Sequence, residues 1–338
     1  MMKWISGMLW VGLGLGIAAP ASSQDAPPSA PVGEVVDLAP VLVSGVQPGP
    51  GMWRVTAPNG NTLWILGTVA PLPAKLEWRA DEVQAVIASA DAVLTSPGWK
   101  VDADVGFFRR LTLIRPAMQA AHDPEGRRLE DILPAEVYAR WLRLKPRYLG
   151  RDRGVEKDRP LVAATRLYGA ALEDVGLDLR SPVTRAVEKA YKARRLTPVD
   201  TRVVIKVDDP RAALKELRAN TLDDVQCLQR TMDVVEYHLP LLVERANAWA
   251  VGDIEALQAL PVRDAYDTCR GAIAGSGFGR QRGLGDLDAR AEQSWLKAAK
   301  TTLATHKVVF ATVPVHYLVS STGYLHLLGE AGYTVQSP

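Results

Sequence analysis

Short apolar segments alternate along this chain with longer segments in which apolar residues recur every three or four positions. Residues 52–57 and 62–68 are rich in β-branched and aromatic residues, and residues 58–61 (Pro-Asn-Gly-Asn) between them have the Asn-Gly chemistry of a tight turn. These two segments predict a β-hairpin. Further apolar segments predict strands at 91–96, 196–204, 307–312 and 333–335.

Most of the remaining sequence has the spacing of amphipathic helices. In residues 77–89, for example, Val83, Val86 and Ile87 share one face. The predicted helices span residues 77–89, 134–144, 160–169, 182–195, 222–250, 292–306 and 323–331, with another beginning after Asp209-Pro210. Ser181 and Asp209 are predicted to cap the helices that follow them, and Asp253 to cap a further short helix. Strands so widely separated by helices predict an α/β or α+β fold: a small central sheet, mixed or parallel, with an N-terminal β-hairpin and many surrounding helices.

The first 50 residues lack this pattern. Lys3, an uncharged segment at 7–19 and small residues at 19–23 are typical of a secretory signal peptide, which we expect at residues 1–23. The apolar segment is short for a membrane span of about 20 residues, so cleavage is favoured over an uncleaved anchor. Residues 24–50 are rich in proline and alanine and predict a linker.

We therefore expect one folded domain at residues 51–338, with helical insertions at about 102–195 and 209–306. The signal predicts export, to the periplasm or the medium, and no further segment is apolar and long enough for a transmembrane helix after cleavage.

Composition excludes two broad classes of protein. Of 338 residues 47% are hydrophobic, which excludes a disordered chain. The 40 Lys and Arg residues nearly balance the 38 Asp and Glu residues, and basic residues occur in runs no longer than pairs. The sequence therefore predicts no nucleic-acid partner.

The two cysteines, Cys227 and Cys269, both follow the predicted signal peptide. In an exported protein such a pair is more often bridged than free, so a disulfide is the favoured interpretation and two buried free thiols the alternative. Neither cysteine belongs to a CxxC motif of the kind that binds zinc.

Candidate chemistry follows the predicted strands, because functional groups in open α/β sheets gather at the carboxyl ends of the strands. Gly67, Thr68 and Ala70 end or follow the hairpin, and Ser96 ends the next strand. The corresponding residues of the later strands are Asp200 and His316.

The residues at these strand ends are part of a wider similarity: the chain resembles the TraB/GumN family, which is related to the Tiki-type metallopeptidases. The landmarks are NTLWILGTVAPLP at 61–73, ADAVL at 90–94, TPVDT at 197–201, ANAWAVGDIEAL at 246–257, SWL at 294–296 and VVFATVPVHYLVSSTGYLHLLGEAGYTV at 308–335. The resemblance implies two G-x-x-H motifs and a glutamate that hold a divalent metal ion, which activates water for hydrolysis. It also implies a cysteine pair near the positions of Cys227 and Cys269.

The sequence departs from this pattern where the ligands belong. Ala70 replaces the first motif histidine, and Ser96 (or Thr95) stands at the glutamate position. His316 is kept, and Asp200 replaces a longer acid, whereas a catalytic zinc ion typically keeps three protein ligands. We therefore predict a degenerate family member with a vestigial pocket, no intact catalytic residues and no metal or other cofactor.

These observations favour an inactive protein that binds a protein or peptide partner or regulates a process in the cell envelope. One alternative is an active metal-dependent hydrolase or peptidase with His316 and Asp200 as ligands and a further histidine, such as His122 or His238. Another is a helix-rich scaffold that acts through an exposed apolar surface. The glycine-rich residues 275–285 lack the spacing of a phosphate-binding loop and predict a loop between helices.

Overall fold

The computed structural model describes residues 50–338 except 104–105, 107–109, 221 and 261–264, and it leaves the side chains of residues 265 and 266 undescribed. The predicted signal peptide and all but the last residue of the predicted linker lie outside the described residues. In the described ranges no helix combines the length and the apolar character that crossing a bilayer requires.

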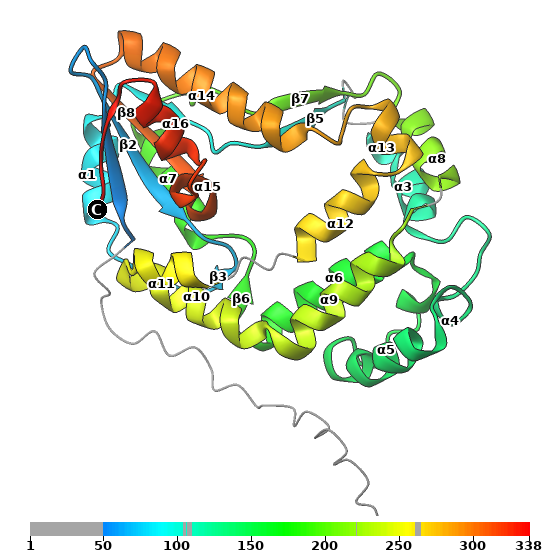
Figure 1. Ribbon diagram of the computed structural model, residues 1–338. Coiled ribbons are helices and arrows are strands. Elements are labelled where there is room, and N and C mark those ends of the chain that lie inside the picture. Colours follow the sequence, from blue (N-terminus) through cyan, green and yellow to red (C-terminus); the bar gives the residue numbers. More distant parts are fainter. Residues whose placement is uncertain (1–49, 104–105, 107–109, 221, 261–264) are drawn as a thin grey trace, which may run out of the picture. The chain divides into compact units, whose positions relative to one another are not determined.

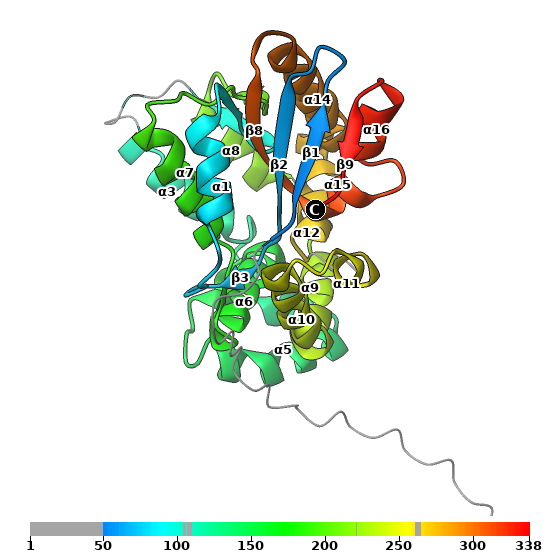
Figure 2. The same cartoon turned by 90° about the vertical axis from the view of Figure 1, so that its left-hand side faces the viewer.

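A five-stranded mixed sheet forms the centre of the fold (Figure 1). The hairpin strands β1 (Met52–Thr56) and β2 (Thr62–Thr68) are antiparallel, as the sequence predicted. Strand β8 (Val308–Pro314) runs parallel to both β2 and β4 (Ala92–Leu94), and β9 (Thr334–Gln336) closes the far edge beside β1. Figure 2 shows β8, β2, β1 and β9 side by side in this order, which confirms the predicted fold class.

Helices surround this sheet and two smaller pairs of strands. The antiparallel pair is β3 (Leu72–Pro73) with β6 (Leu177–Asp178), and the parallel pair is β5 (Trp99–Asp102) with β7 (Val203–Lys206). The helices are α1 (Asp81–Ser89), α3 (Ile114–Ala121), α4 (Leu129–Ile132), α5 (Ala135–Tyr148), η1 (Val155–Lys157, a 3-10 turn), α6 (Pro160–Asp174), α7 (Pro182–Ala193), α8 (Pro210–Ala219), α9 (Val225–Tyr237), α10 (Leu239–Val251), α11 (Ile254–Ala259), α12 (Ala265–Ala274), α13 (Gly277–Gln281), α14 (Leu287–Thr305), α15 (Val315–Val319) and α16 (Tyr324–Glu330).

The core lies between the central sheet and the helices that contact it. Ile65 and Phe310 of the sheet are fully buried, as is Trp295 of α14. Helix α14 contacts β2, β4 and β8, and α1 contacts β8. Burial of these large apolar side chains is the main favourable contribution to folding.

Local capping signals formed as the sequence predicted. The Ser181 hydroxyl accepts hydrogen bonds from the backbone of Val183 and Thr184 at the start of α7. The carboxylates of Asp209 and Asp253 cap α8 and α11 in the same way. Each cap satisfies backbone N–H groups that the first helical turn leaves without partners.

Two of the predicted elements are wrong in their extent. The single helix predicted at 222–250 is two helices, α9 and α10, which are divided at His238. Pro240 explains the division, because proline has no N–H group to donate to the carbonyl of residue 236. The strand predicted at 196–204 also divides, into a single bridge between Val199 and Leu94 and the separate strand β7.

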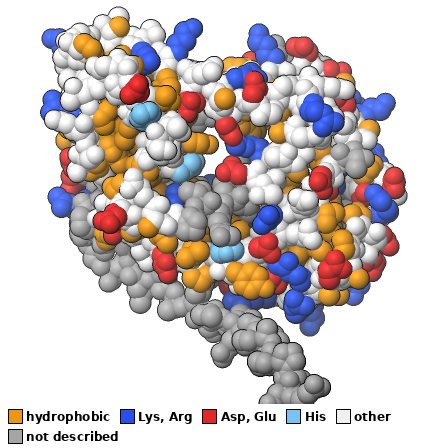
Figure 3. All heavy atoms as spheres, in the orientation of Figure 1, with side chains coloured by type: hydrophobic (Ala, Val, Ile, Leu, Met, Phe, Trp, Pro, Cys, Tyr) orange, Lys and Arg blue, Asp and Glu red, His pale blue; other side chains and the backbone are white. Residues whose placement is uncertain are grey.

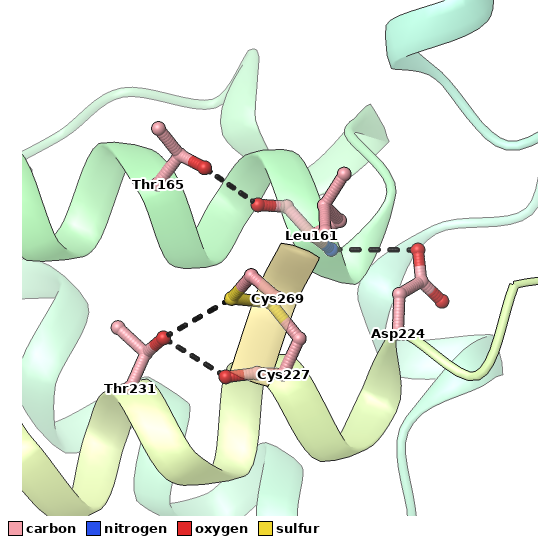
Figure 4. The surroundings of a disulfide bond; sticks show 6 residues. All are labelled: Leu161, Thr165, Asp224, Cys227, Thr231 and Cys269. Atoms are coloured by element: carbon pink, nitrogen blue, oxygen red, sulfur yellow. Dashed lines mark hydrogen bonds between the residues drawn. A yellow bond between two sulfur atoms is a disulfide. The ribbon is translucent and has the colours of Figure 1, made fainter. Parts of the chain in front are cut away.

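A disulfide between Cys227 and Cys269 joins α9 to α12 (Figure 4). Cys227 is fully buried, and the hydroxyl of Thr231 donates a hydrogen bond of 2.9 Å to its carbonyl oxygen. The same hydroxyl lies 3.9 Å from the Cys269 sulfur. The bond therefore lies in the helical interior and fixes α12 against α9.

Gly67, near the end of β2, lies where two side chains approach the backbone closely. A Cβ atom added at this position would lie 2.5 Å from the Trp53 ring and 2.8 Å from a methyl group of Val315. Glycine is therefore the residue that lets β1, β2 and α15 pack together here.

We expect Gly67→Ala to destabilise the protein by about 1–3 kcal/mol, because the added methyl group must displace Trp53 or Val315. Urea unfolding measures the change. Gly169→Ala is the matched control: an added Cβ there meets no atom within 4 Å, so this variant of α6 should gain about 0.5–1 kcal/mol. Equal effects at both positions would contradict the packing argument.

We expect replacement of both cysteines by serine to lower the free energy of unfolding by about 4 kcal/mol, because the bond closes a loop between residues 42 positions apart. Chemical unfolding with and without a dithiol reductant is the measurement. Reductant should destabilise the native chain and leave the double variant unchanged.

Candidate functional site at the strand ends

The parallel strands of the central sheet bring several predicted residues to one edge. Thr68 is paired with Pro314 across β2 and β8, and Leu94 with Ala311 across β4 and β8. Because these three strands are parallel, their carboxyl ends lie along the same edge. This edge, with the residues that follow it, is called the strand-end site below. It includes Gly67 and Thr68 at the end of β2, Ala70 just after that strand, Ser96 after β4 and His316 after β8.

Hydroxyl groups occupy the end of β4. The Ser96 hydroxyl lies 2.6 Å from that of Thr312 on β8, and the Thr95 hydroxyl lies 3.0 Å from that of Thr201. Thr95 also accepts a hydrogen bond of 3.0 Å from the backbone N–H of Thr201. The position at which the family resemblance implies a glutamate thus carries neutral groups that hydrogen-bond one another.

Asp200 directs its carboxylate to two basic residues. Its oxygens lie 2.7 Å from the Lys100 ammonium on β5 and 2.8 Å from the Arg202 guanidinium. Hydrogen bonds from Arg202, and then from Lys100, hold the pKa of Asp200 far below its usual range. The carboxylate is therefore ionised, and its charge is balanced within the β5–β7 region.

His316, the second residue of α15, lies in a partly buried environment. Its ring centroid is 4.0 Å from that of Tyr317. Burial lowers the pKa of His316, and the positive charge of Arg245 lowers it further, while the negative charges of Asp267 and Asp288 act in the opposite direction. The imidazole is therefore neutral at pH 7.

Three aromatic rings form a series of contacts that begins at His316. The rings of Tyr317 and Tyr324 are stacked with centroids 5.8 Å apart, and Trp295 lies 5.2 Å from Tyr324. Arg270 of α12 hydrogen-bonds Tyr317 and forms a 2.6 Å ion pair with Asp288 of α14. The side chains behind His316 thus join α12, α14, α15 and α16.

Sequence reasoning did not single out two residues of this region, Arg245 and Trp249. The Trp249 indole N–H donates a 2.8 Å hydrogen bond to the carbonyl oxygen of Gly67, at the end of β2. Arg245 lies one helical turn earlier on α10 and is 5% exposed. The available signal was the spacing of Leu242, Arg245 and Trp249, which places a charged residue on the buried face of an amphipathic helix.

The other two histidines that were considered as additional ligands have different neighbours. His122 lies 3.1 Å from the carboxylate of Asp158, which is 1% exposed. The ring of His238 meets that of Tyr237 edge-on at 6.5 Å. Among the described residues, no group of three or more His, Cys, Asp and Glu side chains is arranged to hold a metal ion.

A separate cavity of about 660 Å³ lies beside the disulfide. Its lining includes Cys227 of α9, Thr268 of α12 and the turn at Gly275, Ser276 and Gly277. The glycine-rich segment predicted as a loop contains the short helix α13 in place of a continuous loop. Ser276 caps this helix through a 3.0 Å hydrogen bond from Gly279.

A family model, that of the TraB/PrgY/gumN family, matches residues 51–337 of the chain. The match therefore covers the sheet, the strand-end site and all of the described helices. No curated protein and no solved structure matches the chain.

We expect the pKa of His316 to lie below its ordinary value of 6.5 and to rise in Arg245→Met, because that substitution removes a neighbouring positive charge. Arg245→Lys, the control, should keep it low. NMR titration of the imidazole measures both. Since the unfolded chain takes up the proton near pH 6.5, the contribution of neutral His316 to stability is present above that pH and is lost as the pH falls toward the folded pKa. An unchanged pKa in Arg245→Met would assign the shift to burial alone.

Proposed function

The chain belongs to the TraB/PrgY/gumN family, and we propose that it is a catalytically inactive member that works by binding in the cell envelope. The observation that carries the proposal is the combination, at the strand-end site, of missing ligands with a buried arginine beside the remaining histidine. The support for inactivity and for binding comes from different residues.

The residues at the strand-end site do not fit a divalent cation. The two positions that the family resemblance assigns to ligands hold Ala70, which has no donor atom, and Ser96, whose hydroxyl is paired with Thr312. The carboxylate of Asp200 is engaged by two basic residues.

The positive charge of Arg245 is a further reason why His316 does not suit a divalent cation. The charge of Arg245 that lowers the proton affinity of the imidazole also disfavours a divalent ion at this side chain. Metal binding and protonation of the imidazole are disfavoured for the same reason. No hydrolytic step is therefore assigned to this site, because losing one member of a catalytic unit commonly costs several orders of magnitude in rate.

The same edge retains features that suit binding. Trp249 and Gly67 hold α10 against β2, so the edge keeps its arrangement without a metal ion. Neutral His316 and the hydroxyl group of Thr68 provide hydrogen-bonding capacity, and Tyr317 provides an aromatic surface. These groups match the backbone and side chains of a protein or peptide partner.

The envelope location is supported by two observations. Residues 1–23 have the pattern of a signal peptide, and the chain pairs its two cysteines in a disulfide, which is compatible with an exported protein. Disulfides persist in the periplasm and in the medium, because neither is kept reduced by the cytosolic thiol systems.

The proposal is tested by calorimetric titration with Zn²⁺, Mn²⁺ and Co²⁺. The native chain should bind no more of these ions than His316→Ala does, and His326→Ala is the control for weak binding by an exposed histidine. The triple variant Ala70→His, Ser96→Glu, Arg245→Met should gain affinity for a divalent ion, because it supplies two donors and removes the repelling charge. A stoichiometric ion in the native chain that disappears in His316→Ala would refute inactivity through ligand loss.

A further inference from the structure

Helix α3 and Leu111, two residues before its N-cap Leu113, carry an apolar stripe that is exposed to solvent. Leu111, Ile114 and Met118 are 53%, 56% and 60% exposed, and they lie within eight consecutive residues. Ile114 and Met118 are one helical turn apart, so they share a face of α3. Apolar side chains that cluster at the surface in this way mark an interaction site more often than scattered ones do.

The opposite face of α3 attaches the helix to the protein. Ala120 is 7% exposed, and it is the buried residue of this helix. Helix α8 contacts α3, and the Arg211 guanidinium of α8 donates a 3.2 Å hydrogen bond to the carbonyl oxygen of Thr112 (Figure 1). The apolar stripe therefore faces away from the element that holds the helix.

The charge of this segment has one sign. Residues 110–121 contain Arg110 and Arg115 and no acidic residue, and Arg211 adds a third guanidinium beside Thr112. The nearest acid in sequence to Arg211 is Asp209, whose carboxylate is used to cap α8. By contrast, acidic and basic side chains are interspersed over the face of the molecule drawn in Figure 3.

We propose that α3 docks on a phospholipid surface with anionic headgroups, with Leu111, Ile114 and Met118 in the interfacial layer and Arg115 at the headgroups. A helix with an apolar face flanked by basic residues binds such a surface by lying in its plane. A protein partner is the less favoured occupant, because three side chains on one convex helix fall well short of the roughly 800 Å² per partner of a standard interface.

This surface is independent of the strand-end site. The residues of the stripe belong to α3 and the turn before it. Helix α3 contacts α8, and the carbonyl oxygen of Ala121 accepts a 2.9 Å hydrogen bond from the backbone N–H of Arg159; these neighbours are not residues of the strand-end site. Loss of membrane docking would therefore leave the electrostatics of His316 unchanged, and the metal titrations of the preceding section would not be affected.

Vesicle sedimentation with the full chain tests the proposal. All variants carry the same N-terminal residues, so any contribution of those residues to vesicle binding is the same in each. We expect binding to vesicles of phosphatidylglycerol and phosphatidylcholine, and weaker binding to vesicles of phosphatidylcholine alone. This difference should disappear in about 0.5 M salt, because that ionic strength screens the attraction between basic side chains and anionic headgroups. Ile114→Ser with Met118→Ser should weaken binding to the mixed vesicles at least tenfold, and Arg115→Gln should weaken it severalfold.

The matched control is Leu142→Ser with Val251→Ser, two exposed apolar residues on other helices, which are 50% and 44% exposed. This control should bind as the native chain does, and circular dichroism should show that all variants are folded. Three results would overturn the proposal: no vesicle binding by the native chain, equal binding by the α3 variant, or an oligomeric state that changes in the α3 variant while vesicle binding is absent.

Discussion

The hydrogen bond from the Trp249 indole to the Gly67 carbonyl is the contact on which the strand-end site depends. Both groups are buried, so each would lose a partner at considerable cost if the helix moved away from the strand. The absence of a side chain at Gly67 lets Trp53 and Val315 approach the same backbone segment. One residue therefore joins β1, β2, α10 and α15, and this junction places Arg245 near His316.

Because this junction is built from packing and backbone hydrogen bonding, it needs no metal ligand. Ligands at the strand ends can be replaced while the fold stays intact, since none of them supports the contacts of Gly67. The hydroxyl pair of Ser96 and Thr312 joins neighbouring parts of the edge in place of coordination. A fold and the chemistry that it carries are in this sense separable, which is consistent with the binding role that we propose.

Local signals were predicted well because each depends on a few neighbouring residues. The Asn-Gly turn, the strands of the hairpin and the caps at Ser181, Asp209 and Asp253 all formed as expected. The division between α9 and α10 was also a local signal, Pro240, whose missing N–H group was given too little weight. The pairing of β5 with β7 was not predictable, because these four-residue strands lie about a hundred positions apart and their sequences do not specify a partner.

The sequence by itself determined the N-terminal hairpin, the departures from the family motifs at Ala70 and Ser96, and the presence of a single strand-end histidine. Only the tertiary structure decided that the Asp200 carboxylate belongs to Lys100 and Arg202, and that Arg245 lies near His316. The physical reason is that the partner of a charge depends on distances between segments far apart in the chain, which periodicity and motifs do not encode. Residue types limit which interactions are possible, and the packing of helices on the sheet selects among them.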